Sequence, residues 1–213
     1  MMDLYTFFRS GTSHRLRIAL ALKGLDVNHI PVDLRTEDHS KPSYTSINPQ
    51  GLVPALRVEE RILTQSPAII EWLEETYPEP ALLPKDIFAR HYVRSIASLV
   101  GCDIHPVNNR RILECLRGTF HATEEQILEW CGRWISHGFD ALETMLVREG
   151  QSGTFCYGDT PSLADVYLIP QVESARRFKM DMSRWPKIQT IDAKCMTMPE
   201  FINAAPMKQK DAS

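Results

Sequence analysis

This sequence of 213 residues lacks a basic excess, a paired-cysteine motif and a long apolar run. Its net charge of −3 is opposite to the basic excess that nucleic-acid-binding proteins normally carry, so we expect no nucleic-acid partner. The five cysteines are odd in number and irregularly spaced, and no two form a C-x-x-C pair. This pattern disfavours a disulfide framework or a zinc site and indicates reduced thiols, so we expect no metal.

The N-terminal region shows no export or membrane signal. No basic segment precedes an apolar core there, and the longest apolar run nearby, Ile18 to Leu22, is far too short to span a bilayer. We therefore expect a cytoplasmic protein without a membrane partner. A hydrophobic content of 43% and a charged content of 24% are typical of globular proteins, and the length allows one large domain or two small ones.

The first informative stretch is the turn around Ser10. Residues 4–7 have the composition of a strand, and apolar residues at helical spacing follow the turn up to Gly24. Ser10, Thr12 and Ser13 therefore place hydroxyls and backbone N–H groups at a helix N-terminus, where an anion is stabilised. The same field lowers the pKa of a thiol. The turn contains no cysteine, so a thiol has to arrive with a ligand.

The rest of the first 79 residues alternates between strand and helix. Residues 29–34 form a second strand, expected to pair in parallel with the first, and 54–58 with 62–64 have hairpin spacing. A helix follows with Ser66 as its expected N-cap and a proline at its first position. The order β-α-β, then β-β-α, is that of a thioredoxin-like layer, which we assign to residues 1–79.

The second part of the chain is expected to be all-helical. Three prolines between 78 and 84 indicate a linker, placed at 80–86, and the helical domain then covers 87–213. Ser162 and Asp165 form a capping pattern that we interpret as structural, and the segment from Ala204 looks like a disordered tail. The predicted fold class is thus α/β plus all-α. The expected helices cover residues 89–116, 123–148, 162–178 and 186–196.

Several stretches together resemble one family. The sequence is similar to the zeta-class glutathione transferases in residues 10–20, 48–56, 65–73 and 158–165. Residues 101–113 and 170–178 narrow the resemblance to the bacterial glutathione-dependent maleylpyruvate isomerases and the related maleylacetoacetate isomerases. The resemblance implies the glutathione transferase fold, glutathione as cofactor and a homodimer.

The resemblance also implies roles for individual residues. It places Ser10 and Thr12 against the glutathione sulfur. It also implies that the peptide bond before Pro54 is cis. Eukaryotic zeta enzymes have a Ser-Ser-Cys pattern where this sequence has Ser-Gly-Thr, so no role of that cysteine applies here. The residues that the resemblance assigns to glutathione binding are Gln50, Val53, Pro54, Gln65, Ser66, His105 and Asn109.

The resemblance also implies which part of glutathione some of these residues meet. It implies that the Val53 backbone pairs with the cysteinyl peptide and that Gln65 and Ser66 hold the γ-glutamyl end. It places His105 and Asn109 near the glycine end or the second substrate. On physical grounds alone, hydroxyl residues in such places are also ordinary turn formers and helix caps.

Arginines are the main indication of the substrate. The planar guanidinium suits carboxylates, although adjacent arginines on a helix are often only a solvated face. Neighbours on a helix are about 100° apart, so at most one of each adjacent pair can point into a cleft, and which one stays open. We assign Arg110 to substrate binding, with Arg111 as its alternative. The predicted catalytic set is Arg9, Ser10, Thr12, Arg176 and Arg177.

These assignments predict a glutathione-dependent cis–trans isomerase of a small dicarboxylate keto acid. The leading reaction is the conversion of maleylpyruvate to fumarylpyruvate in the catabolism of aromatic compounds. Reversible thiolate addition makes the conjugated double bond single, so that it can rotate. The alternatives are a maleylacetoacetate isomerase, a conjugating glutathione S-transferase, and a non-catalytic binding module on the same fold.

Overall fold

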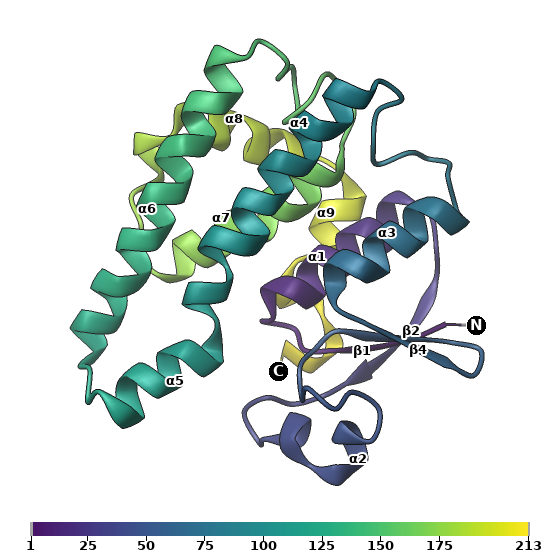
Figure 1. Ribbon diagram of the computed structural model, residues 1–213, viewed down its shortest axis with the longest axis vertical. Helices are drawn as coiled ribbons and strands as arrows, with labels where there is room; N and C mark the ends of the chain where they lie inside the picture. Colours follow the sequence, from purple (N-terminus) through teal and green to yellow (C-terminus); the bar gives the residue numbers. More distant parts are fainter. Residues whose placement is uncertain (1, 213) are drawn as a thin grey trace. The chain divides into compact units, whose positions relative to one another are not determined.

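The computed structural model describes residues 2–212, which fall into two compact units (Figure 1). One unit comprises the residues up to Leu82 together with those from Met196 onward, and the other is Leu83–Cys195. The sequence predicts a helical domain over 87–213. The structure differs at its C-terminal end, because the stretch from Met196 packs with the first unit.

The first unit contains a four-stranded sheet with the strand order β2-β1-β3-β4. Strand β1 pairs with β2 in parallel and with β3 antiparallel, and β3 forms an antiparallel hairpin with β4. This mixed sheet confirms the predicted thioredoxin-like order of elements. The strands are β1 (Met2–Thr6), β2 (Val27–Pro31), β3 (Ala55–Val58) and β4 (Arg61–Thr64).

Two helices, α1 (Gly11–Leu22) and α3 (Ser66–Thr76), lie side by side against this sheet (Figure 1). Helix α1 ends at Leu22, with Lys23 as its C-cap. Gly24 follows with φ +65°, as expected for a glycine that terminates a helix. A short helix, α2 (Pro42–Thr45), lies between β2 and β3, where the sequence pattern predicts neither helix nor strand. One core cluster of the first unit includes residues of the β1–α1 turn and consists of Tyr5, Phe7, Phe8, Val32, Tyr44, Val53 and Ala55.

Up to residue 212 the C-terminal segment forms regular structure, so the predicted disordered tail is wrong. Helix α9 (Pro199–Ala204) is followed by two 3₁₀ helices, Pro206–Lys208 and Lys210–Ala212. The side chain of Gln209 donates hydrogen bonds to backbone carbonyls of residues 203 and 205. Polar composition suggested disorder, but Gln209 uses its polar side chain in hydrogen bonds within the segment.

In the helical unit, the long helix predicted over 89–116 is wrong. Helix α4 (Ile87–Ser98) passes into a π-helical turn, Leu99–Ile104, and α5 (Arg110–Thr119) begins only after a 3₁₀ turn at Pro106. Proline has no N–H to continue a helix, which explains the interruption. The missing Cβ of Gly101 also leaves room for the Tyr167 ring, which a Cβ would approach to 2.9 Å.

The remaining predicted helices are confirmed within a few residues. Helix α6 (Glu124–Arg148) begins with a capping box at Thr123, and α7 (Leu163–Arg177) and α8 (Pro186–Cys195) follow. None of the helices found within residues 2–212 is long and apolar enough to cross a membrane.

The start of α7 is fixed by a buried carboxylate. Asp165 has no exposed surface, and its oxygens accept hydrogen bonds from the N–H groups of Cys156 and Ser162 and from the Ser162 hydroxyl. Burial raises the pKa of Asp165, and these hydrogen bonds oppose the rise. The structural interpretation of the Ser162–Asp165 pattern is confirmed.

Candidate active site

The hydroxyl residues of the β1–α1 turn form one hydrogen-bonded chain. Ser10 is the N-cap of α1, and its Oγ accepts the N–H of Ser13 at 3.2 Å. The hydroxyls of Ser10 and Thr12 are 2.9 Å apart, and Thr12 Oγ1 donates to the Val53 carbonyl at 2.9 Å. The structure therefore brings together three of the residues that the sequence assigns to glutathione.

These hydrogen bonds give the hydroxyls of Ser10 and Thr12 different roles. The single proton of Thr12 Oγ1 is used in the bond to the Val53 carbonyl, so in the pair it is Ser10 that donates to Thr12. A Ser10 hydroxyl that rotates away from Thr12 still has a proton to donate to an anion in the turn. Ser10 is thus suited to contact a thiolate, and Thr12 is suited to hold Ser10 and Val53 in place.

The Val53–Pro54 peptide bond is cis, as predicted. The preceding peptide is held by two residues that the sequence analysis missed. Tyr44 Oη and Asn48 Nδ2 each donate to the Leu52 carbonyl at 2.6 Å. Burial raises the pKa of Tyr44 to about 12, so its phenol is neutral and remains a donor near neutral pH. In the sequence they stand out only as an aromatic residue and an asparagine in a polar stretch between two predicted strands.

The N-terminus of α3 has an unusual polar arrangement. Gln65, with φ 66°, is the N-cap, so Ser66 is the first helical residue and the prediction of Ser66 as N-cap is wrong. Gln65 Nε2 donates to Gln50 Oε1 at 2.5 Å, which brings two further predicted residues together. Ser66 is 3% exposed, and its Oγ has no hydrogen-bond partner within residues 2–212.

These groups fit a bound carboxylate. Within the described part of the chain no side chain caps α3, so N–H groups at its start keep their hydrogen-bonding capacity. A buried hydroxyl without a partner costs free energy unless something bonds to it. A carboxylate at this helix N-terminus would accept from both, and the helix dipole favours the negative charge.

In the helical unit, three predicted residues lie on one short segment. His105 ends the π-helical turn, Asn109 caps α5 by accepting the N–H of Arg111 at 3.2 Å, and Arg110 forms an ion pair with Glu114. The sequence analysis missed Asn108 on the same segment. It is 8% exposed, and neither polar side-chain atom has a hydrogen-bond partner within residues 2–212. A ligand or an ordered water would satisfy them.

The predicted arginines of α7 have different surroundings. Arg176 forms an ion pair with Asp192 of α8, whose side chain is only 5% exposed. Arg177 Nη2 donates to Ser174 Oγ at 3.2 Å, and its guanidinium lies 5.1 Å from the centre of the Phe178 ring. In the first unit, Arg9 has an exposed side chain at the hydroxyl turn. Arg176 therefore has a clear structural role, whatever it does for a substrate.

Comparison with known proteins places the chain in a class. Residues 9–76 match the family model described as "Glutathione S-transferase, N-terminal domain", and this range contains the hydroxyl turn, the cis-proline and the start of α3.

The relatives narrow this class further. A maleylpyruvate isomerase of Ralstonia sp is 57% identical over 212 residues, which cover 100% of both proteins. The holo structure of maleyl pyruvate isomerase, a bacterial glutathione S-transferase in the zeta class, superimposes with a TM-score of 0.98 at 56% identity and covers 99% of this chain and 100% of that one. A maleylacetoacetate isomerase of Methylobacterium extorquens AM1, solved with malonate and glutathione, gives a TM-score of 0.96 at 36% identity, with 99% of each chain covered. This chain belongs to the zeta class of the glutathione S-transferase family.

Proposed function

We propose that the protein is a glutathione-dependent cis–trans isomerase that converts maleylpyruvate to fumarylpyruvate in the catabolism of aromatic compounds in the cytoplasm. The observation that carries this proposal is the hydrogen-bonded chain from Ser10 through Thr12 to the Val53 carbonyl, at a helix N-terminus that has no cysteine of its own. Identity of 57% to a maleylpyruvate isomerase supports it.

The first unit has the groups needed to hold glutathione. The buried Ser66 hydroxyl and the start of α3 fit the γ-glutamyl carboxylate, with Gln65 and Gln50 beside them. The backbone of Val53, before the cis-proline, fits the cysteinyl peptide as an added strand would. The glutathione in the Methylobacterium relative supports this assignment. His105 and Asn109 stay assigned to the glycine end or the substrate.

When bound, glutathione supplies a thiolate that adds reversibly to the conjugated double bond, so that the bond becomes single and rotates. The Ser10 hydroxyl donates a hydrogen bond to the sulfur, and the N-terminus of α1 adds its positive dipole, so both lower the pKa of the thiol. Thr12 holds the Ser10 hydroxyl and the Val53 carbonyl in place through its two hydrogen bonds. Arg9, with Arg176 or Arg177, is assigned to the substrate carboxylates and to the negative charge that develops on the carbonyl oxygen.

The closest alternative substrate is maleylacetoacetate, which has the same maleyl group on a longer keto acid. The Methylobacterium maleylacetoacetate isomerase and its bound malonate support a dicarboxylate site of this kind. A conjugating transferase would instead keep the thioether and would suit an apolar pocket. The arginines assigned here favour an anionic substrate over that alternative.

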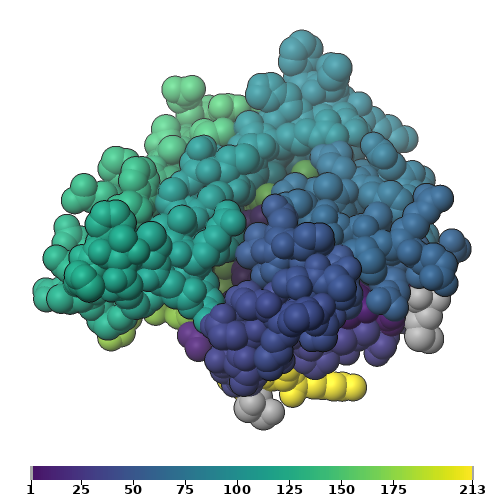
Figure 2. Space-filling model, turned by 60° about the horizontal axis from the view of Figure 1, so that its bottom comes forward, coloured from purple at the N-terminus to yellow at the C-terminus, as the bar shows by residue number. Residues whose placement is uncertain are grey.

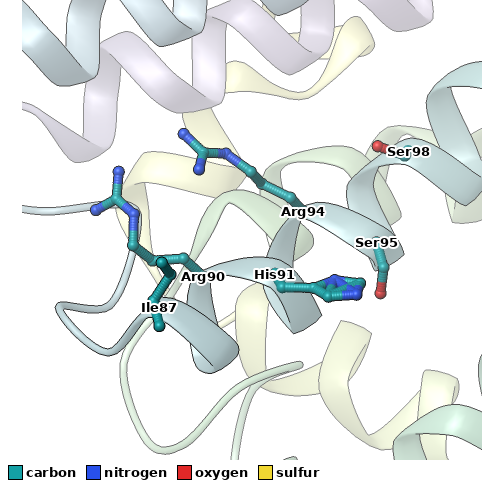
Figure 3. A pocket seen from close by; sticks show the side chains of 6 residues that line it. All are labelled: Ile87, Arg90, His91, Arg94, Ser95 and Ser98. Carbon is teal, nitrogen blue, oxygen red and sulfur yellow. The ribbon is translucent and has the colours of Figure 1, made fainter.

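We propose that the protein forms a homodimer and that α4 lies in the interface between its two copies. At the start of this helix, the adjacent apolar side chains of Ile87 and Phe88 are 73% and 80% exposed, and a partner copy would cover them. Next to them is a surface hollow with Arg90, His91 and Arg94 in its lining; Figure 3 shows the two guanidinium groups on the same side of α4, one turn apart. Sedimentation velocity measures whether the protein has the mass of two copies.

The experiment that tests the reaction follows the loss of maleylpyruvate absorbance with purified protein and catalytic glutathione. We expect fumarylpyruvate over many turnovers, with glutathione recovered intact. S-methylglutathione is the control, because it has the same peptide but no thiol, and it should give no reaction. Stoichiometric loss of glutathione would identify a conjugating transferase. Turnover of maleylacetoacetate with none of maleylpyruvate would identify the alternative isomerase.

A further inference from the structure

The C-terminal segment, residues 206–212, is bonded to the β1–α1 turn, residues 7–10. Asp211 Oδ2 accepts the backbone N–H of Phe8 at 2.9 Å, although the two residues are 203 positions apart in sequence. Ala212 packs against the core cluster that contains Phe8. In Figure 1 the yellow C-terminal segment lies beside the start of α1, and part of this segment is visible at the surface in Figure 2.

Arg17 holds the other side of the same peptide segment. Its side chain is buried, with the residue 4% exposed, and Nη2 donates to the Phe8 carbonyl at 3.0 Å. Nη1 donates to Thr6 Oγ1 at 3.1 Å, and Nε donates to the Ala204 carbonyl at 2.9 Å. Burial lowers the pKa of Arg17 to about 10, and the Asp211 carboxylate opposes this shift. Arg17 is therefore charged near neutral pH.

The bonded peptide is adjacent to the proposed thiolate donor. Ser10 N–H donates to the Phe7 carbonyl at 3.1 Å, so the orientation of residues 7 and 8 fixes where Ser10 begins α1. Asp211 holds the N–H of Phe8 and Arg17 holds its carbonyl, which leaves this turn little rotational freedom. A misplacement of about 1 Å in a reacting or hydrogen-bonding group can cost about 100-fold in rate.

We propose that Asp211 is a positioning residue for the reaction: through the Phe8 N–H it holds the β1–α1 turn so that the Ser10 hydroxyl meets the glutathione sulfur. The C-terminal segment is thus part of the apparatus that activates the thiol, not only a chain end packed on the core. This inference rests on the proposed function, because it assigns the segment to the same site.

The test compares three full-length variants. Asp211→Ala removes the acceptor, Asp211→Asn keeps an acceptor oxygen at the same place, and Lys208→Ala is the matched control, because Lys208 is exposed on the same segment. Ultraviolet absorbance of the thiolate, followed against pH, gives the pKa of the bound thiol. For Asp211→Ala we expect this pKa to rise by about 1 and kcat to fall about tenfold, with the KM for the maleyl substrate little changed. Asp211→Asn should stay within about threefold of wild type, because its bond to Phe8 remains.

Hydrogen–deuterium exchange at residues 7–10 is measured on the same proteins without glutathione. We expect faster exchange in Asp211→Ala than in Lys208→Ala and wild type. A variant that melts at lower temperature but keeps the exchange of the turn and the thiol pKa unchanged would overturn the proposal, since Asp211 would then be only a structural anchor. Failure of the wild type to bind glutathione would instead refute the proposed function, while the exchange data still decide whether Asp211 holds the turn.

Discussion

The two units hold their candidate functional residues in different ways. In the first unit, Ser10, Thr12 and Val53 are joined by short side chains and a backbone carbonyl, so the fold of the turn fixes their positions. In the second unit, long arginine side chains extend from helices and pair with carboxylates, as Arg176 does with Asp192. A group of short side chains held by one turn can therefore be recognised from a local motif. The role of an arginine depends instead on which carboxylate lies within its reach.

The two units also differ in how they hold a buried titratable group. His14 of α1 is 3% exposed, and its pKa is lowered from 6.5 to about 3 by burial and by the positive charges of Arg17 and Arg15. The first unit thus keeps this group neutral. In the second unit, the buried Asp165 is surrounded by hydrogen-bond donors that stabilise a carboxylate. Substitutions in the hydroxyl turn, at His14 and at the arginines of α7 therefore test each unit separately.

The largest effect is expected for Ser10→Ala. This variant removes the hydroxyl that donates to the thiolate, and loss of such a donor typically lowers kcat by about 10²–10³. It also removes the N-cap of α1, at a cost of about 1 kcal/mol in unfolding free energy. Steady-state kinetics with maleylpyruvate and urea unfolding measure the two effects separately.

Thr12→Val is the matched comparison, because it removes the neighbouring hydroxyl with little change in shape. Its proton is used on the Val53 carbonyl, so we expect a smaller loss of kcat, about tenfold. Equal losses for the two variants would contradict the division of roles between Ser10 and Thr12. A larger loss for Thr12→Val would make Thr12 the thiolate donor.

The next effect is a dependence of stability on pH from His14. Its folded pKa lies below the unfolded value of 6.5, so its contribution to stability is present above pH 6.5 and is lost as the pH falls toward about 3. Between pH 7 and pH 5 the loss is about 2 kcal/mol, because the unfolded chain gains a proton that the folded chain does not. His14→Leu should remove this part of the slope in urea unfolding measured at both pH values. An identical slope in the variant would show that His14 does not carry it.

The sequence predicted the parts of the fold that local patterns determine. The strands, α6 and α7 follow from periodicity and caps, and the hydroxyl turn follows from Ser10 and Thr12 at the strand–helix junction. The break in the helix predicted over 89–116 was missed because the apolar residues keep a helical spacing across Pro106, although the backbone changes there to π and 3₁₀ turns. Pro106 was a local signal of the break, because proline cannot continue a helix, but the spacing of the apolar residues was given more weight.

Long-range contacts were the other part that the sequence could not show. The bond between Asp211 and the Phe8 N–H joins a polar chain end to a turn 203 residues earlier, and nothing in either segment alone indicates it. The pairing of Arg176 with Asp192 is hidden for the same reason, since an Arg-Arg dipeptide gives no sign of its partner. Motifs identified the residues of the site; the structure was needed to find what holds them.

The smallest effect, and the sharpest test of the second unit, compares Arg176→Ala with Arg177→Ala. Arg176→Ala leaves the buried Asp192 carboxylate without its cation, so we expect a loss of about 1–2 kcal/mol in unfolding free energy. Arg177→Ala removes a bond to Ser174 and a ring contact at the end of α7, and it should cost less than about 0.5 kcal/mol. Urea unfolding of both variants measures this difference.

The same pair decides whether either arginine serves the reaction. A substrate-binding arginine should lower kcat/KM for maleylpyruvate well beyond its effect on glutathione affinity. Asp192→Asn is the control for Arg176, because it breaks the ion pair but keeps the guanidinium. If Asp192→Asn and Arg176→Ala lose the same stability but only Arg176→Ala loses activity, Arg176 binds substrate in addition to its structural role. If neither arginine variant loses activity, the carboxylate-binding role assigned to the end of α7 is wrong, and another cation, such as Arg9 or Arg110, has to bind the substrate carboxylates.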